Sequence, residues 1–172
     1  MALHLIVDGY NLIRQTPAWQ ALDAIDLQWG REALLESLAA YRRDKHYPIT
    51  VVFDGTAGAE ILGHRDYYQG ILVLYSRQGE KADDVIKRLV DRERERSLVI
   101  SSDREIMDHA LRVGAAVISA GEFSSRLQAP GQAMEADGEG DEPPLSHGTK
   151  KKGPAHRAPK KIRRLHRRLK KI

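Results

Sequence analysis

Acidic side chains follow four short apolar segments of the sequence, each either directly or after a short loop. They are Asp8 in LIVDGYN, with Asn11 three residues later, Asp54 in VVFDG, Asp83 and Asp84 after SRQGEK, and Asp103 in VISSD. Taken singly, each has an ordinary explanation, because aspartate is a common N-cap and turn residue. Taken together, they would place four or five carboxylates in one cleft if the preceding segments end at one edge of a sheet.

The segments that would position these acids are predicted to be strands alternating with helices. Strands covered on both faces are predicted from apolar runs at Leu3–Val7, Ile49–Phe53, Ile71–Tyr75 and Leu98–Ile100, with a weaker run at Ala115–Ile118. Helices are predicted from apolar periodicity in Arg31–Asp44, Ala82–Arg94 and Arg104–Val113, the last closed by Gly114. This order predicts an α/β fold with a doubly wound sheet, in which functional groups gather beyond the carboxyl ends of the strands.

A cluster of carboxylates at that edge would have a definite chemical use. Like charges a few ångströms apart raise one another's pKa and destabilise an empty site, so a fold tolerates them where a cation binds. The chain has no cysteine, and no histidine pair has ligand spacing on a predicted helix. Oxygen ligands then favour Mg²⁺ or Mn²⁺ over zinc. Two such ions about 4 Å apart could activate water and stabilise the leaving oxygen in phosphodiester hydrolysis.

The motifs VDGYN, VVFDG, ADDVI and SSD, in this order and spacing, resemble the NYN branch of the PIN-like nucleases, in particular the YacP-like bacterial ribonucleases. The resemblance covers residues 3–127. It implies a PIN-like three-layer α/β/α sandwich with a central, mostly parallel sheet, and endoribonuclease activity that depends on a divalent metal. Some YacP-like members are associated with ribosomes and cut messenger RNA there.

The resemblance also implies roles for individual residues. Asp8 and Asp83 would be the central metal ligands, and Asp103 would complete the acidic set directly or through a bound water. Asn11 would orient Asp8 or touch the substrate. Asp54 lies at the matching strand end and is a further candidate metal ligand.

Other residues near the expected cleft are candidates for supporting roles. Asp84 is assigned to the helix start, and Ser101 and Ser102 would hold the Asp103 carboxylate by hydrogen bonds. Tyr10 could stack on a base or pack against the sheet edge, and both alternatives remain open. Four cations could contact phosphates or simply be solvated, namely Arg14, Arg77, Lys81 and Arg104. His64 and His109 are expected to lie away from the strand ends.

Charge is distributed unevenly along the 172 residues, whose net charge is +4. Residues 1–129 carry a net −3 and residues 130–144 a net −5, whereas residues 145–172 carry 12 Lys and Arg and no acid. We therefore predict a nuclease domain at 1–128, a disordered acidic linker at 129–149 and a basic tail at 150–172, whose apolar residues recur at helical spacing. The tail's predicted RNA contacts are Lys160, Lys161, Arg163, Arg164, Arg167 and Arg168. Its alternatives are a solvated appendage and, ranked lower, a ligand for anionic membranes.

These observations predict a cytoplasmic, Mg²⁺- or Mn²⁺-dependent endoribonuclease that acts on RNA, with ribosome-associated RNA as a candidate substrate. Neither a secretory signal nor an apolar stretch of about 20 residues is found, so no membrane partner is expected. The rival interpretation is a catalytically inactive RNA- or ribosome-binding module. An NTPase or dehydrogenase is disfavoured because the chain lacks a glycine-rich phosphate loop. A receiver domain is set aside because Ser119, rather than lysine, follows the last predicted strand.

Overall fold

The computed structural model describes residues 3–55 and 64–128. Its elements in chain order are β1 (His4–Asp8), α1 (Gly9–Arg14), α2 (Pro17–Ile25), α3 (Leu27–Lys45), β2 (Ile49–Phe53), β3 (Arg65–Tyr68), β4 (Ile71–Tyr75), α4 (Ala82–Glu93), the 3-10 turn η1 (Arg94–Arg96), β5 (Ser97–Ile100), α5 (Arg104–Val113), β6 (Ala116–Ile118) and α6 (Ala120–Gln128). The predicted linker (129–149) and tail (150–172) lie outside the described residues, so that division of the chain stays a prediction.

The strands form one sheet in the order β3-β4-β2-β1-β5-β6. All neighbouring strands are parallel except β3, which runs antiparallel to β4. The chain builds outward from β1 to β2 and β4, and then crosses to the other side of β1 for β5 and β6. This reversal makes the sheet doubly wound and places a topological switch point between β1 and β5. The predicted mostly parallel α/β sheet is therefore confirmed.

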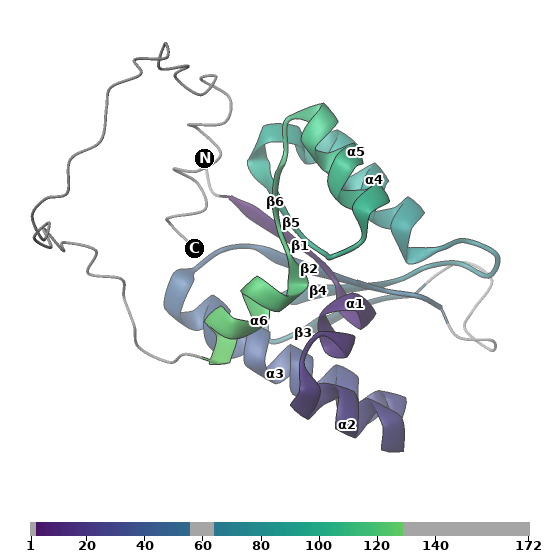
Figure 1. Ribbon diagram of the computed structural model, residues 1–172, viewed down its shortest axis with the longest axis vertical. Helices are drawn as coiled ribbons and strands as arrows, with labels where there is room; N and C mark the ends of the chain where they lie inside the picture. The colour runs from purple at the N-terminus through teal and green to yellow at the C-terminus, as the bar shows by residue number, and fades with distance from the viewer. Residues whose placement is uncertain (1–2, 56–63, 129–172) are drawn as a thin grey trace, which may run out of the picture.

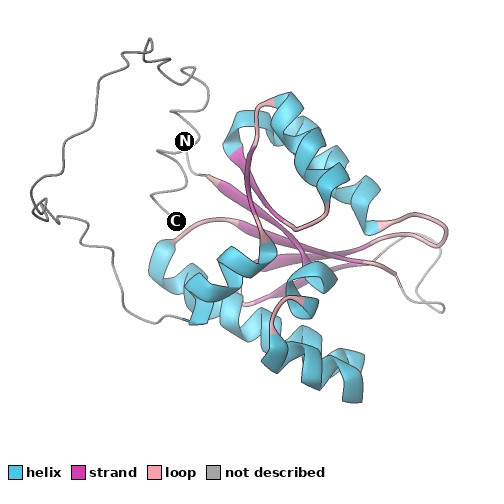
Figure 2. Cartoon of the chain, viewed as in Figure 1, coloured by secondary structure: helices cyan, strands magenta, loops and turns pink. Residues whose placement is uncertain are grey.

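Helices cover both faces of the sheet and complete three layers (Figure 1). Helices α4 and α5 lie on one face, and α1, α2, α3 and α6 lie on the other (Figure 2). Successive strand residues point to opposite faces, so Leu5 and Val7 join the core under α3, whereas Ile6 joins the core under α4. All three are fully buried. Burial on both faces explains why the strand sequences are continuously apolar rather than alternating.

Three predicted helices are confirmed, with small differences at their ends. Helix α5 has the predicted bounds, and Gly114 follows it with φ +93°, the left-handed conformation that closes a helix at low cost to glycine. Helix α4 ends one residue before the predicted bound. Helix α3 starts four residues earlier than predicted, because Asp26 caps it by accepting a hydrogen bond from the backbone N of Gln28 at 2.7 Å.

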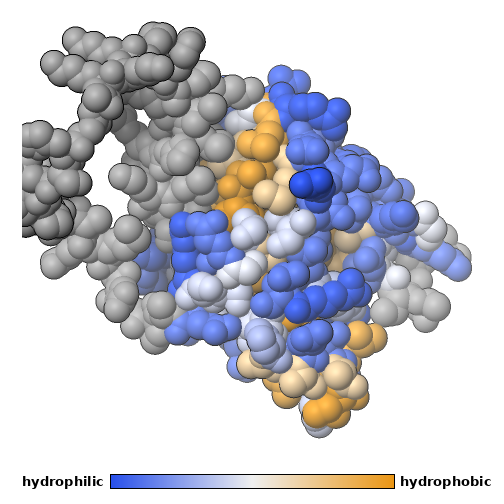
Figure 3. All heavy atoms as spheres, viewed as in Figure 1, coloured by the Kyte–Doolittle hydropathy of each residue, from blue (hydrophilic) through white to orange (hydrophobic). Residues whose placement is uncertain are grey.

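One corner of the surface is apolar, at the junction of α2 and α3. Ile25, Leu27 and Trp29 have 70%, 46% and 49% of their surfaces exposed, and apolar surface is visible over the end of α2 at the foot of Figure 3. Within the described ranges, no helix is both long and apolar enough to cross a membrane.

Candidate functional site

Asp8 is the anchored member of the acidic set. It ends β1 beside the switch point, on the face covered by α4, and only 8% of its surface is exposed. Ser101 Oγ donates to its Oδ2 at 3.0 Å, and the backbone N of Asn11 donates to its Oδ1 at 3.4 Å. Burial raises the pKa of Asp8 to about 6, with smaller increases from the charges of Asp83 and Asp54, against the two hydrogen bonds. Asp8 is therefore fixed in place and titrates close to neutral pH.

Asp83 links the acids on separate elements electrostatically. It lies in the first turn of α4 and is half-buried. Burial raises its pKa first, and the charges of Asp103, Asp54 and Glu105 raise it further, whereas Lys87 lowers it. The pKa values of Asp8 and Asp83 are thus both raised by carboxylates that follow β2 or lie at the starts of α4 and α5. Lys87 and Glu105 were not anticipated, although the four-residue spacing from Asp83 to Lys87 on a helix could have indicated the first.

Asp54 supplies the side-chain hydrogen bond at the start of α4. The N-cap of α4 is Lys81, which makes no side-chain cap hydrogen bond. Instead, Asp54 Oδ1 accepts a hydrogen bond from the backbone N of Ala82 at 2.7 Å. Asp83 and Asp84 lie in the first turn of α4, so the assignment of Asp84 to the helix start is confirmed, but neither is the N-cap. The capping hydrogen bond comes instead from Asp54, directly after β2. Its second carboxylate oxygen leaves Asp54 a candidate metal ligand, as predicted.

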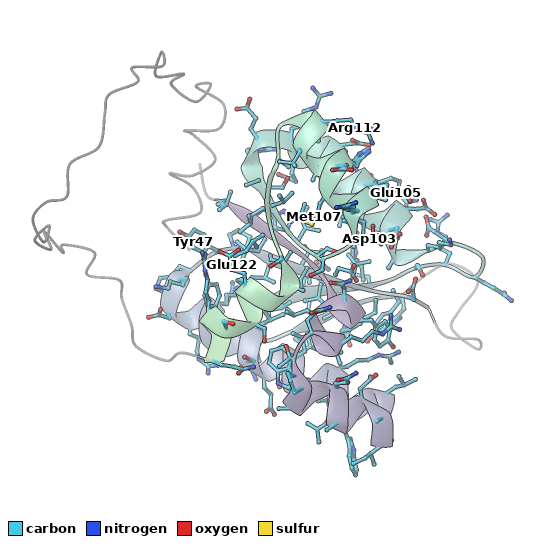
Figure 4. All side chains as sticks on the ribbon, viewed as in Figure 1. Tyr47, Asp103, Glu105, Met107, Arg112 and Glu122 are labelled. Atoms are coloured by element: carbon cyan, nitrogen blue, oxygen red, sulfur yellow. The ribbon has the colours of Figure 1, made fainter. Side chains whose placement is uncertain are left out.

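Asp103 caps α5 and shares a serine with Asp8. Its Oδ1 accepts from the backbone N of Glu105 at 2.8 Å and from that of Ile106 at 3.2 Å. Its own backbone N donates to Ser101 Oγ at 3.0 Å. The fully buried Ser101 hydroxyl therefore joins the loop before α5 to the Asp8 carboxylate. Figure 4 shows Asp103 and Glu105 together at the end of α5 nearest α1.

The two serines play different parts from those predicted. Both were expected to hold the Asp103 carboxylate, but Ser101 donates to Asp8. The backbone N of Ser102 donates to Asn11 Oδ1 at 2.8 Å, and the Ser102 hydroxyl accepts from the backbone N of Ala120 at 3.1 Å. Asn11 therefore orients Asp8 through its backbone, while its side chain ties α1 to the loop that follows β5.

The cations predicted to flank the cleft are on the surface. All four are exposed, with Arg14 at the end of α1, Arg77 in the loop after β4, Lys81 at the N-cap of α4 and Arg104 at the start of α5. Their RNA-binding role stays a prediction. The six basic tail residues from Lys160 to Arg168 lie outside the described residues.

Tyr10 packs against the sheet edge, which is one of the two alternatives that the sequence left open. Its ring meets that of Phe53 edge-on, with centroids 5.2 Å apart, and its hydroxyl accepts hydrogen bonds from Arg31. His64 also lies at this edge, because its ring is 5.9 Å from that of Tyr75, the last residue of β4. The expectation that His64 lies away from the strand ends is wrong, because antiparallel β3 starts where β4 ends.

The donor chemistry of the edge suits a hard divalent cation. Asp8, Asp54, Asp83 and Asp103 offer carboxylate oxygens, the ligands that Mg²⁺ and Mn²⁺ prefer. In this structure, however, no three His, Asp or Glu residues within 3–55 and 64–128 form a group that could hold one ion. The donor types fit, and a shared ion would require the acids to approach one another more closely. The metal assignment therefore stays a prediction.

The sheet order, the three layers and the acidic carboxyl edge define a PIN-like NYN fold. The chain belongs to the YacP-like NYN domain family, whose model matches residues 5–168. This match extends beyond the predicted 3–127 and takes in most of the basic tail. The Bacillus subtilis protein named "Uncharacterized protein YacP" is 29% identical over 85 residues, which span 49% of this chain and 49% of that protein.

Solved structures of Rae1 (YacP) from Bacillus subtilis share the fold. A mutant of that protein superposes with a TM-score of 0.61 and 25% sequence identity, over 73% of this chain and 75% of the other. A second structure gives a TM-score of 0.61 at 22% identity, over 100% and 82% of the two chains.

Proposed function

We propose that the protein is a divalent-metal-dependent endoribonuclease whose centre is the acidic edge formed by Asp8, Asp54, Asp83 and Asp103. The observation that carries the proposal is the state of Asp8. A carboxylate that is 8% exposed, with a pKa raised to about 6 and further acids acting on it, destabilises the fold rather than supporting it. Strongly perturbed carboxylates in such surroundings are typical of functional sites. A bound dication would offset both the burial and the repulsion.

In this proposal each side chain has a separate part. Asp8 and Asp83 would hold Mg²⁺ or Mn²⁺, with Asp103 and Asp54 completing the acidic set. When bound, the ion would lower the pKa of water and offset negative charge on the phosphate. Ser101 and Asn11 keep the Asp8 carboxylate in one orientation. Hydrolysis then joins the water oxygen to phosphorus and breaks the bond to the leaving oxygen, which takes up a proton.

RNA is the substrate class that family membership supports, since NYN domains belong to the PIN-like nucleases and have a nuclease-like, RNA-related role. We propose further that the basic tail, including Lys160, Lys161, Arg163, Arg164, Arg167 and Arg168, delivers the enzyme to large structured RNA, of which ribosomal RNA is one candidate. The 12 cations of residues 145–172 supply the charge for such docking. The extent of the family match, through residue 168, supports a shared role for this segment.

One observation favours a second candidate, an RNA-binding module without catalysis. Asp54 and Asp103 each commit one oxygen to a helix N-terminus, which is a structural use that a protein could keep after losing activity. A purely binding surface would, however, gain nothing from presenting Asp8 and Asp83 to phosphate, because carboxylates repel it. We therefore rank the nuclease first.

A covalently closed, single-stranded RNA circle separates the two candidates. A metal-dependent endonuclease linearises the circle in Mn²⁺ or Mg²⁺, stops in EDTA and resumes when the metal is restored. A binding module shifts the circle in a gel and leaves it closed under all conditions. The proposal would be contradicted if the protein bound the circle without cutting it and also failed to cut RNA when ribosomes were supplied.

A further inference from the structure

A caged guanidinium lies at the same sheet edge as the acids, on the opposite face. Arg31, in the first half of α3, places its guanidinium carbon 5.3 Å from the ring centroid of Tyr10, 5.5 Å from that of Phe53 and 5.4 Å from that of Tyr75. The rings of Phe53 and Tyr75 stack on each other with centroids 5.7 Å apart. Three aromatic rings therefore hold one cation, each by a favourable cation–π contact.

The partner that hydrogen-bonds the Arg31 guanidinium is a neutral hydroxyl rather than a carboxylate. Nε of Arg31 donates to the Tyr10 hydroxyl at 2.8 Å, and one terminal nitrogen of the guanidinium donates to the same oxygen. None of the ion pairs found in the part of the chain that the structure describes involves Arg31. Both of these hydrogen bonds go to one neutral hydroxyl, so the positive charge of the guanidinium is supported by dipoles and rings. Arg31 keeps donors available for an anion.

The chain places this cation next to the acidic edge. Tyr10 comes two residues after Asp8, and Phe53 directly precedes Asp54. Because successive strand residues point to opposite faces, the acids face α4 and the aromatic rings face α3. An RNA strand that crosses the edge between β1 and β2 would meet the acids on one side and the guanidinium on the other.

We propose that Arg31 binds a backbone phosphate of the RNA strand beside the one that is cut, and that Tyr10, Phe53 and Tyr75 form its rigid support. The substrate class rests on the proposed function. A guanidinium suits this task because its planar fork can bind two phosphate oxygens at once. Holding it against aromatic rings before the strand arrives reduces the entropy that binding would otherwise cost.

The test measures binding separately from cutting, in the full-length Asp83→Asn protein. Its ligand is a short single-stranded RNA of mixed sequence, titrated over a range of KCl concentrations. Arg31→Gln is expected to weaken binding about tenfold to a hundredfold, the usual range for a lost hydrogen bond to a charged group. It should also reduce the slope of log affinity against log salt by about 0.7, the share of one phosphate on a single strand.

Arg43→Gln is the matched control, because Arg43 is an exposed arginine of the same helix that bonds to Gln69 at 2.9 Å, away from the cage. It should leave affinity and slope unchanged. The proposal would be overturned if Arg31→Gln melted like the parent and bound RNA with the parent's affinity and slope.

Should Arg31→Gln fail to fold, Arg31→Lys and Tyr10→Phe keep the test decisive. The lysine variant should lose affinity while keeping the slope, and Tyr10→Phe should lose severalfold in affinity. Parental binding by both variants would also overturn the proposal.

The outcome is separable from that of the proposed nuclease. If RNA is never cut, or is cut equally well by the Asp83→Asn protein, the metal centre is wrong. A loss of binding in Arg31→Gln would then still place a phosphate contact at the cage. If cutting depends on Asp83 but RNA binding is unchanged by Arg31→Gln, the proposed nuclease is supported and the proposed phosphate contact is wrong.

Discussion

Replacing Asp8 with asparagine should make the metal-free protein more stable at neutral pH. Asparagine keeps an oxygen that can accept the hydrogen bond from Ser101, and it carries no charge to be buried or repelled. The folded protein holds the Asp8 carboxyl group with a pKa of about 6, whereas its ordinary value is 3.8. Wild-type protein must therefore ionise a group that the fold prefers to keep neutral.

The magnitude follows from this difference in pKa. Between pH 3.8 and 6 the folded state binds more protons at Asp8 than the unfolded state, so the free energy of unfolding falls as pH rises through this window. One pKa unit corresponds to about 1.4 kcal/mol. The penalty removed by Asp8→Asn is then about 3 kcal/mol at pH 7.5 and about 1 kcal/mol at pH 4.5.

The assay is urea unfolding in EDTA at both pH values for wild type, Asp8→Asn and Asp108→Asn. Asp108 is an exposed acid on α5, and its substitution should change the free energy of unfolding by less than about 0.5 kcal/mol. The variant Asp8→Asn should gain stability at pH 7.5 and lose most of that gain at pH 4.5. Equal stability of Asp8→Asn and wild type at both pH values would refute the claim that the fold strains this carboxylate.

Three further outcomes are expected. Gly9→Ala should destabilise the protein by about 1–3 kcal/mol in thermal melting, because its Cβ would lie 2.3–2.9 Å from atoms of the fully buried Phe53 ring. Gly121→Ala, whose Cβ would meet its nearest atom at 3.9 Å, is the control and should be tolerated. Asp54→Ala should lower the free energy of chemical unfolding by about 1 kcal/mol, because it removes the acceptor at the start of α4. Asp54→Asn, which keeps an acceptor oxygen, should lower it less. Equal losses in the two variants would contradict the capping role of Asp54. Deleting residues 130–172 should leave metal-dependent cutting of short RNA intact while weakening binding to large RNA in gel shifts; loss of all cutting would contradict this division.

The parallel core of the fold could be predicted because its strands are buried on both faces and therefore carry unbroken apolar runs. The edge strand β3 escaped prediction for the opposite reason. Its residues Arg65–Tyr68 are mostly exposed, and pairing with β4 through a turn stabilises it. That turn uses Gln69 and Gly70, both at positive φ, a pair that signals a hairpin less clearly than Asn-Gly. Helix α2 had a readable start, since Pro17 follows Thr16.

At the site, the sequence indicated which acids gather but not how they are held. The strand-end rule brought Asp8, Asp54 and Asp103 to one edge because parallel strands finish together. The hydrogen bonds that distinguish their roles join residues far apart, 28 positions from Asp54 to Ala82 and 93 from Asp8 to Ser101. The surroundings of Arg31 could not be predicted from the sequence for the same reason, since its aromatic partners come from three other elements.

The neighbouring acids at the start of α4 give the most direct test of the proposed metal centre. Asp83 is half-buried among the other acids. Asp84 is exposed, and its charge contributes to the raised pKa of Arg88, which comes chiefly from the hydrogen bond to Glu80. Cleavage of single-stranded RNA should be measured across a Mn²⁺ titration for wild type, Asp83→Asn and Asp84→Asn. Asp83→Asn should lose about a hundredfold or more in rate, whereas Asp84→Asn should cut like wild type. Equal rates for Asp83→Asn and wild type would contradict the proposed metal centre.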